Sequence, residues 1–256
     1  MDALPFDVYI ALGDSMSIDK YPVRDLQNRG ASNGNENVGA ASLLYCNDAE
    51  LYPEFDGNDL KRRCSSIEFL NFTEDGYTTE DVIEGDLDRL NQYRDKSERC
   101  LVTLSAGGND LLQLHLSGKT EADRKAFFDR ELTELQIRYD RLLSKCMQLL
   151  PSAIMILTTV YDPTDGTGEF PGDVLTGEIP IEYIERFNDF LRATARPSSR
   201  LHVADVHHHF LGHGMKAKGV NDFWYWMPSP IEPGARGASE IRRVWLESIA
   251  GVSHGA

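Results

Sequence analysis

The sequence has 256 residues, and its 41 acidic and 26 basic side chains give it a formal net charge of −15. A charge of this sign repels the phosphates of nucleic acids and the surfaces of anionic membranes, so neither is expected as a partner. The length, with 41% hydrophobic residues, is sufficient to bury a sizeable core. We therefore expect a single domain over residues 1–256.

The first residues, MDALPFDVYIALGDS, have an acidic side chain at position 2 and lack the basic segment and long apolar segment of a secretion signal. No stretch has the length of a membrane-spanning helix. The four cysteines do not have the CxxC spacing of a zinc site or redox motif, and they stand at Cys46, Cys64, Cys100 and Cys146. This pattern is typical of reduced thiols, so we predict a cytoplasmic location.

Five short apolar runs, rich in β-branched residues, are expected to form buried strands. In chain order they span residues 7–12, 67–73, 100–106, 153–160 and 201–206. The segments with helical periodicity are residues 39–55, 78–90, 123–150, 179–196 and 235–249. This alternation predicts an α/β fold, a three-layer α/β/α sandwich with a five-stranded parallel sheet. Two long loops, residues 161–180 and 209–233, are expected beside the functional site.

The first expected strand ends in the string GDS at residues 13–15. Glycine permits a tight turn there, and the hydroxyl of Ser15 would be exposed at the start of the next segment. A serine in this place can also cap a helix. The string is not the GxSxG motif of the α/β-hydrolases, because no glycine stands two residues after Ser15. The motif alone therefore has two interpretations, a helix cap and a nucleophile.

The next two strand ends carry groups that can stabilise a developing negative charge. Gly76, in the string DGYTT at residues 75–79, can offer its backbone N–H, although the threonines can also simply cap a helix. In SAGGND at residues 105–110, two glycines permit a close approach and the side-chain amide of Asn109 can donate to an oxyanion. A turn rich in Gly and Asn is the structural alternative. The occurrence of Ser, Gly and Asn at three successive strand ends favours a catalytic site.

In these strings and their order, the sequence resembles the SGNH hydrolase superfamily, also called the GDSL esterases. The resemblance rests on GDSMS at residues 13–17, Gly76, and AGGND at residues 106–110, and it covers nearly the whole chain. It implies a flavodoxin-like sandwich and ester hydrolysis through an acyl-enzyme on Ser15, without a cofactor. The oxyanion hole would consist of the N–H groups of Ser15 and Gly76 and the amide of Asn109. Supporting roles are expected for Asp14 and Asp110.

The fourth block of the family departs from its usual form here. The family ends in Asp-x-x-His-Pro, in which the histidine is the base and the aspartate orients it. The corresponding residues 229–233 read SPIEP, so that Glu232 stands in place of the histidine and Ser229 in place of the aspartate. The fourth block therefore supplies no imidazole to accept the proton of Ser15.

Four of the seven histidines lie together in ADVHHHFLGHG, residues 204–214. His213 follows a glycine and has the freedom to reach Ser15, so our first prediction is a triad of Ser15, His213 as base and Glu232 as its orienting acid. A second candidate pair is His208 with Asp205, which reads as a literal Asp-x-x-His. A third possibility is Glu232 as the direct base, which requires burial to raise its pKa.

Two further hypotheses belong to other functional classes. A metal-assisted hydrolase would use the histidine cluster at residues 207–213, although the sequence does not identify a full set of ligands. A non-catalytic ligand-binding protein would have kept the fold after losing the base. The main prediction is an esterase acting on a small-molecule ester, either an acyl ester or an acetylated carbohydrate, with aromatic residues 223–227 near the pocket.

Overall fold

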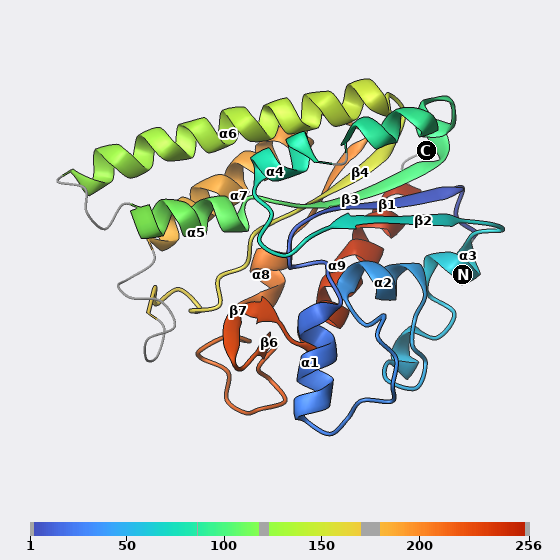
Figure 1. Ribbon diagram of the computed structural model, residues 1–256, viewed down its shortest axis with the longest axis horizontal. Helices are drawn as coiled ribbons and strands as arrows, with labels where there is room; N and C mark the ends of the chain where they lie inside the picture. Colours follow the sequence, from blue (N-terminus) through green and yellow to red (C-terminus); the bar gives the residue numbers. More distant parts are fainter. Residues whose placement is uncertain (1–2, 86, 118–122, 170–179, 254–256) are drawn as a thin grey trace.

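The central element of the fold is a sheet of five parallel strands in the order β2-β1-β3-β4-β5 (Figure 1). The structure is a computed structural model that describes residues 3–85, 87–117, 123–169 and 180–253. The strands are β1 (Val8–Gly13), β2 (Glu68–Thr73), β3 (Cys100–Ser105), β4 (Ile154–Thr158) and β5 (Leu201–Ala204). All five were expected from the sequence. Every residue of β1 and β3 is buried, as their continuous apolar runs require when helices cover both faces of a sheet.

Helices cover both faces of the sheet, which confirms the predicted three-layer α/β/α sandwich (Figure 1). One face carries α4 (Thr79–Glu84), the 3₁₀ helix η2 (Leu87–Arg99), α5 (Gly108–Ser117), α6 (Arg124–Leu149) and α7 (Ile181–Ala195). The other side carries α1 (Lys20–Asn28), α2 (Ala40–Tyr45), η1 (Pro53–Phe55), α3 (Leu60–Arg63), α8 (Val206–Phe210) and α9 (Ala235–Ser253). A short hairpin of β6 (Tyr225–Trp226) and β7 (Ser229–Pro233) precedes α9.

The long helix α6 shows how the pattern of the sequence produces this packing. Its apolar residues recur every three or four positions and therefore share one face. The residues of that face are all buried, and they are Phe128, Leu132, Leu135, Tyr139, Leu142, Leu143 and Cys146. Burying a leucine or phenylalanine side chain stabilises a fold by about 1.5–3 kcal/mol, so this face anchors α6 to the layer beneath it.

The boundaries of two expected helices differ from the prediction. The segment 39–55 forms α2 and then η1, separated by an irregular stretch, and the segment 78–90 forms α4 followed by η2. The short helices α1, α3, α5 and α8 were not expected, because each is too short to show a periodic apolar face. Half of the loop predicted at 161–180 lies outside the described residues, since these stop at 169 and resume at 180.

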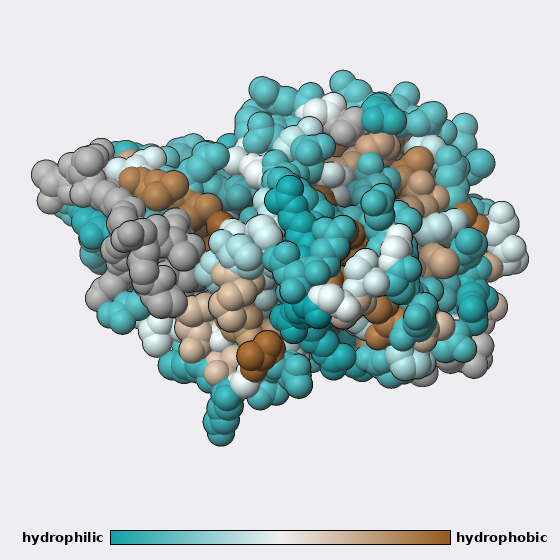
Figure 2. Space-filling model, turned by 60° about the horizontal axis from the view of Figure 1, so that its bottom comes forward, coloured by the Kyte–Doolittle hydropathy of each residue, from teal (hydrophilic) through white to brown (hydrophobic). Residues whose placement is uncertain are grey.

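Hydrophilic residues dominate the surface seen in Figure 2, and the hydrophobic residues form small separate patches between them. This surface agrees with a chain in which acidic residues outnumber basic ones. Within the described ranges, no helix combines the length and the apolar character needed to cross a membrane.

The register of the sheet brings three strand ends to one place. Gly13, the last residue of β1, pairs with Thr73 of β2 on one side and with Ser105 of β3 on the other. The direction of winding reverses between β1 and β3, and in open α/β sheets ligands bind at such a switch point. The loops that follow β1, β2 and β3 therefore meet at the edge where a site is expected.

Candidate active site

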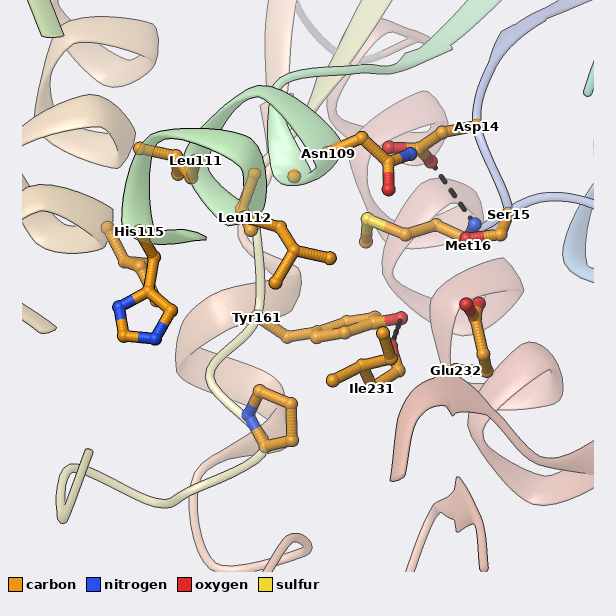
Figure 3. Close-up of a pocket in the computed structure, with 14 residues that line it drawn as sticks. Asp14, Ser15, Met16, Asn109, Leu111, Leu112, His115, Tyr161, Ile231 and Glu232 are labelled. Atoms are coloured by element: carbon orange, nitrogen blue, oxygen red, sulfur yellow. Dashed lines mark hydrogen bonds between the residues drawn. The ribbon is translucent and has the colours of Figure 1, made fainter. Parts of the chain in front are cut away.

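A pocket with a volume of about 90 Å³ lies at the carboxyl edge of the sheet, beside the segments that follow β1, β3 and β4 (Figure 3). Its ionisable and polar side chains belong to Asp14, Ser15, Asn109, His115, Tyr161 and Glu232. Most of the remaining wall is apolar and includes Met16, Leu111, Leu112, Val160, Ile184 and Ile231. The pocket thus joins the Ser15 hydroxyl to a largely apolar chamber.

The turn after β1 places Ser15 in this pocket. Gly13 has a φ of 130°, and a Cβ atom on it would lie 1.7 Å from the carbonyl oxygen of Ser105, so only glycine fits here. The Asp14 N–H donates to the same carbonyl oxygen at 2.9 Å. The hydroxyls of Ser17 and Ser105 hydrogen-bond at 2.7 Å. These contacts lock the GDS turn against the end of β3 and fix the position of Ser15.

Asp14 lies in the same pocket and is buried, with 2% of its surface exposed. Its Oδ1 accepts a hydrogen bond from the Met16 N–H at 3.1 Å, which closes the turn around Ser15. Burial raises the pKa of Asp14 to about 7, although the bonds from Met16 and Ser105 oppose the shift. The bond from the Met16 N–H to this carboxyl therefore helps to hold the shape of the turn.

The loop after β2 and the start of α5 are joined by Asn109. Its Nδ2 donates to the carbonyl oxygen of Tyr77 at 2.9 Å, directly beside Gly76. Gly76 itself has a φ of 80° and is exposed in the turn. An amide nitrogen has two hydrogens, so this bond leaves one hydrogen of Asn109 for another acceptor. The bond orients the amide, which lines the pocket together with Ser15.

Asp110 has a structural position next to the pocket. Its carboxylate accepts from the backbone N–H and the hydroxyl of Thr79 at 2.9 and 2.8 Å, and Arg138 donates to it at 3.3 Å. The Asp110 carboxylate thus has a specific partner at the start of α4. The bond holds the segment after β2 against α5.

Glu232, on β7, extends its carboxyl group toward Ser15 (Figure 3). The residue is 7% exposed, and its Oε2 is buried without a hydrogen-bond partner among the described residues. Burial raises the pKa of Glu232 to about 7, while the Ser15 hydroxyl opposes the shift as a hydrogen-bond partner. The structure thus brings together Ser15 and Glu232, two of the three residues of the expected triad.

His213, the expected base, has a different environment. Its ring stacks on Trp224 with 3.4 Å between the centroids, and its Nδ1 lies 2.9 Å from the carbonyl oxygen of Asp222. His213 is not among the residues that line the pocket, and within the described part of the chain no hydrogen bond joins it to Ser15 or Glu232. The aromatic residues at 223–225 are buried and pack around this loop.

The alternative pair, Asp205 and His208, has a structural explanation. The Asp205 carboxylate caps α8 by accepting from the His208 N–H at 3.3 Å, and it binds the guanidinium of Arg192 at 2.9 and 3.0 Å. The His208 side chain is exposed to solvent. The literal Asp-x-x-His motif is therefore a helix cap in this fold, and its imidazole is not part of the pocket wall.

The remaining histidines of the cluster do not converge on a common point. His209 lies 2.8 Å from Glu240 of α9, whereas His207 is buried in α8. In the ranges that the structure describes, no group of three or more His, Cys, Asp or Glu side chains is arranged to hold a metal ion. His254 lies outside those ranges. The geometry gives the metal hypothesis no specific support.

One ionisable residue of the pocket, His115, was missed at the level of sequence, whereas Tyr161 belongs to a loop that was expected beside the site. His115 is buried at the opposite end of the pocket from Ser15 and Glu232, and Tyr161 forms part of the wall between them (Figure 3). A signal for His115 was available, because it follows Leu111 by four residues and therefore shares a helix face with it. Tyr161 follows β4 directly, in the loop that the sequence analysis had placed beside the pocket.

Comparisons with known proteins agree with this geometry. Residues 11–238 match the GDSL-like lipase/acylhydrolase family. Similar solved structures include a lipase from a goat rumen metagenome, with 19% identity, 94% of this chain and 97% of that chain covered, and a TM-score of 0.57. Phospholipase A1 from Streptomyces albidoflavus is 21% identical, with 95% and 99% covered and a TM-score of 0.57. An acetyl xylan esterase is 14% identical, with 94% and 98% covered and a TM-score of 0.56.

At these identities, the structural likeness shows a shared fold. No curated protein matches the chain. The family match spans most of the sequence, including the segments that follow β1, β2 and β3. This protein therefore belongs to the GDSL-like lipase/acylhydrolase family, and it is a carboxylic ester hydrolase.

Proposed function

We propose that this protein hydrolyses small-molecule esters through an acyl-enzyme formed on Ser15. The observation that carries this proposal is the shared pocket of Ser15 and Asn109, whose positions are fixed by the turns after β1 and β3. The Ser15 oxygen attacks the ester carbonyl, the alcohol leaves, and water then hydrolyses the acyl-enzyme.

The negative charge on the carbonyl oxygen needs donors that are already in place. We assign this role to the backbone N–H groups of Ser15 and Gly76 and to the second amide hydrogen of Asn109. The contact of Asn109 with Tyr77 supports this assignment, because it holds the amide beside Gly76 at no further cost during the reaction. Asp14 and Asp110 support the two turns that carry these donors.

For the substrate, we propose an ester with an apolar acyl chain rather than an acetylated carbohydrate. From Asn109 to His115 the pocket follows α5, and six residues of an α-helix rise about 9 Å. Leu111, Leu112 and Ile184 line this part. Apolar walls stabilise methylene groups and offer few partners to sugar hydroxyls.

The first experiment is labelling with a fluorophosphonate, together with hydrolysis of p-nitrophenyl acetate, butyrate and octanoate. We expect an adduct on Ser15, and kcat/KM that increases from acetate to the longer esters. Ser15→Ala should abolish the adduct and lower hydrolysis by about 10⁴-fold or more, and Asn109→Ala should lower kcat by about 10²–10³-fold. A wild-type protein that is neither labelled nor active would contradict hydrolysis and favour the ligand-binding alternative.

Matched variants on α5 test whether the acyl chain of the substrate binds in this part of the pocket. Leu112→Trp places a larger side chain in the pocket, whereas Leu116→Trp changes a leucine that is 47% exposed on the same helix. Each lost methylene contact corresponds to about fourfold in kcat/KM. We expect Leu112→Trp to remove the preference for octanoate and Leu116→Trp to keep it. An unchanged preference in both variants would contradict this use of the pocket.

A further inference from the structure

We infer that Glu232 itself accepts the proton of Ser15, so that the enzyme works with a serine–glutamate pair and without a catalytic histidine. This inference rests on the proposed acyl-enzyme at Ser15 and names its base. It departs from the usual fourth block of the family, in which a histidine occupies this place.

The position of the carboxyl group is the first argument. Glu232 points from β7 into the pocket toward the Ser15 side chain (Figure 3), and the Ser15 hydroxyl lowers the pKa of this carboxyl group. Its other contacts are few, since Oε2 is buried without a hydrogen-bond partner among the described residues. A buried carboxylate oxygen without a partner is costly, and such groups in pockets are candidates for catalysis.

The electrostatic surroundings make the Glu232 carboxylate basic enough to accept the proton of Ser15. Burial raises the pKa of Glu232 to about 7, close to that of an imidazole, and the charge of Asp75 adds to the shift while Lys20 opposes it. Asp14 is buried in the same pocket, and the charge of Glu232 opposes its ionisation. The phenols of Tyr21 and Tyr161 also face this charge.

Contacts on both sides of Glu232 hold it in place. The Tyr161 hydroxyl donates to the carbonyl oxygen of Ile231 at 2.8 Å, one residue before it (Figure 3). Two residues after it, a Cβ atom on Gly234 would lie 2.7 Å from the carboxylate of Asp25, which accepts from the Ala235 N–H at 2.9 Å. Tyr161 and Asp25 are therefore positioning residues for the base.

The proton balance of the reaction requires only these two groups and water. As the Ser15 oxygen attacks the carbonyl, its O–H bond breaks and the proton moves to Glu232. The resulting acid returns the proton to the alkoxide of the leaving alcohol. In the second half, water attacks the acyl-enzyme and gives a proton to Glu232, which then protonates Ser15 as the acid product leaves.

The described histidines are poorly placed to compete with Glu232. His115 lines the pocket but lies at the end opposite Ser15 (Figure 3). His213 stacks on Trp224, and His209 is held by Glu240. Because His254 lies outside the described residues, the experiment includes the variant His254→Ala.

The decisive experiment compares Glu232→Gln with Glu240→Gln, His213→Ala and His254→Ala. Glu240 is the matched control, because it is also buried but lies on α9 and contacts His209 instead of Ser15. We expect Glu232→Gln to lower kcat/KM for p-nitrophenyl butyrate by about 10²–10⁴-fold and to slow fluorophosphonate labelling. The other three variants should stay within about threefold of the wild type.

A second variant distinguishes a direct effect on catalysis from a loss of activity that is caused by misfolding. Ser229→Asp/Glu232→His installs the Asp-x-x-His of the family at the same place, and we expect it to regain at least tenfold over Glu232→Gln. A Glu232→Gln enzyme that keeps wild-type rates overturns the inference. So does a loss of activity in one of the histidine variants that equals the loss in Ser15→Ala. In both cases, labelling of Ser15 in the wild type would leave the proposed hydrolysis intact.

Discussion

Two buried glutamates, 8 residues apart in the sequence, have opposite electrostatic environments. Glu232, on β7, faces a serine hydroxyl and an apolar pocket, and its pKa is raised to about 7. On α9, burial alone would also raise the pKa of Glu240. Hydrogen bonds from His209 and Arg243, with the charge of Arg236, lower it instead to about 2. Burial thus raises the pKa of a carboxyl group only where hydrogen bonds and nearby cations do not outweigh its effect.

The largest expected effect is on stability, and it has opposite signs at the two positions. The folded pKa of Glu240 lies below its unfolded value of 4.5, so its ion pairs stabilise the fold above pH 4.5 and this contribution disappears as the pH falls toward 2. The folded pKa of Glu232 lies above 4.5, so its ionisation destabilises the fold as the pH rises through 7.

At pH 8 we therefore expect Glu240→Gln to lower the free energy of unfolding by about 2–3 kcal/mol and Glu232→Gln to raise it by a similar amount. Urea unfolding at pH 8 and at pH 4.5 measures both changes. The gain from Glu232→Gln should disappear at pH 4.5, where the carboxyl is protonated in the folded state. A loss of stability from Glu232→Gln at pH 8 would contradict the expectation that the two glutamates affect the free energy of unfolding in opposite directions.

A smaller effect, on kcat, is expected when the hydrogen bond that holds β7 is removed. Tyr161→Phe removes the bond to the Ile231 carbonyl, and a hydrogen bond contributes about 0.5–1.5 kcal/mol, so we expect kcat to fall by about 2–13-fold with little change in KM. Tyr45→Phe, outside the pocket lining, serves as the control. An increase in KM at constant kcat would indicate that Tyr161 contributes to substrate binding rather than to positioning the base.

The smallest expected effect concerns Lys20, whose charge lowers the pKa of Glu232. In Lys20→Met this stabilisation of the carboxylate is lost, so the midpoint of the kcat/KM profile against pH should move upward by less than about one unit. The wild-type profile should rise with pH through a midpoint near 7, because only the ionised form of Glu232 accepts a proton. A downward shift in Lys20→Met would argue against Glu232 as the titrating base.

The sequence was sufficient to predict the sheet and the family, because these depend on local patterns. The strands β1, β3 and β4 are largely apolar runs, and the strings around Ser15 and Asn109 lie directly after β1 and β3. The hairpin of β6 and β7 was missed, since it contains only a few paired residues and a register shift. Short irregular pairing of this kind has no periodicity that a sequence pattern can show.

The identity of the base depends on contacts between distant segments. The glycine before His213 indicates a flexible backbone. The stacking of the His213 ring on Trp224, which fixes the ring, can be seen only once the loop is folded. The alternative of Glu232 as a direct base depends on burial, which a sequence does not display at a single polar position. The sequence therefore identified the residues that form the pocket edge more successfully than the proton acceptor, whose role remains our proposal.

The bond between Asp25 and the Ala235 N–H also has a consequence for the order of folding. It joins residues 210 positions apart and fixes the segment that follows Glu232 beside α1. Contacts of such high sequence separation form late, because a long loop must first close. A chain emerging from the ribosome thus contains Ser15 long before Glu232, and the pocket that both residues line is completed among the last steps of folding.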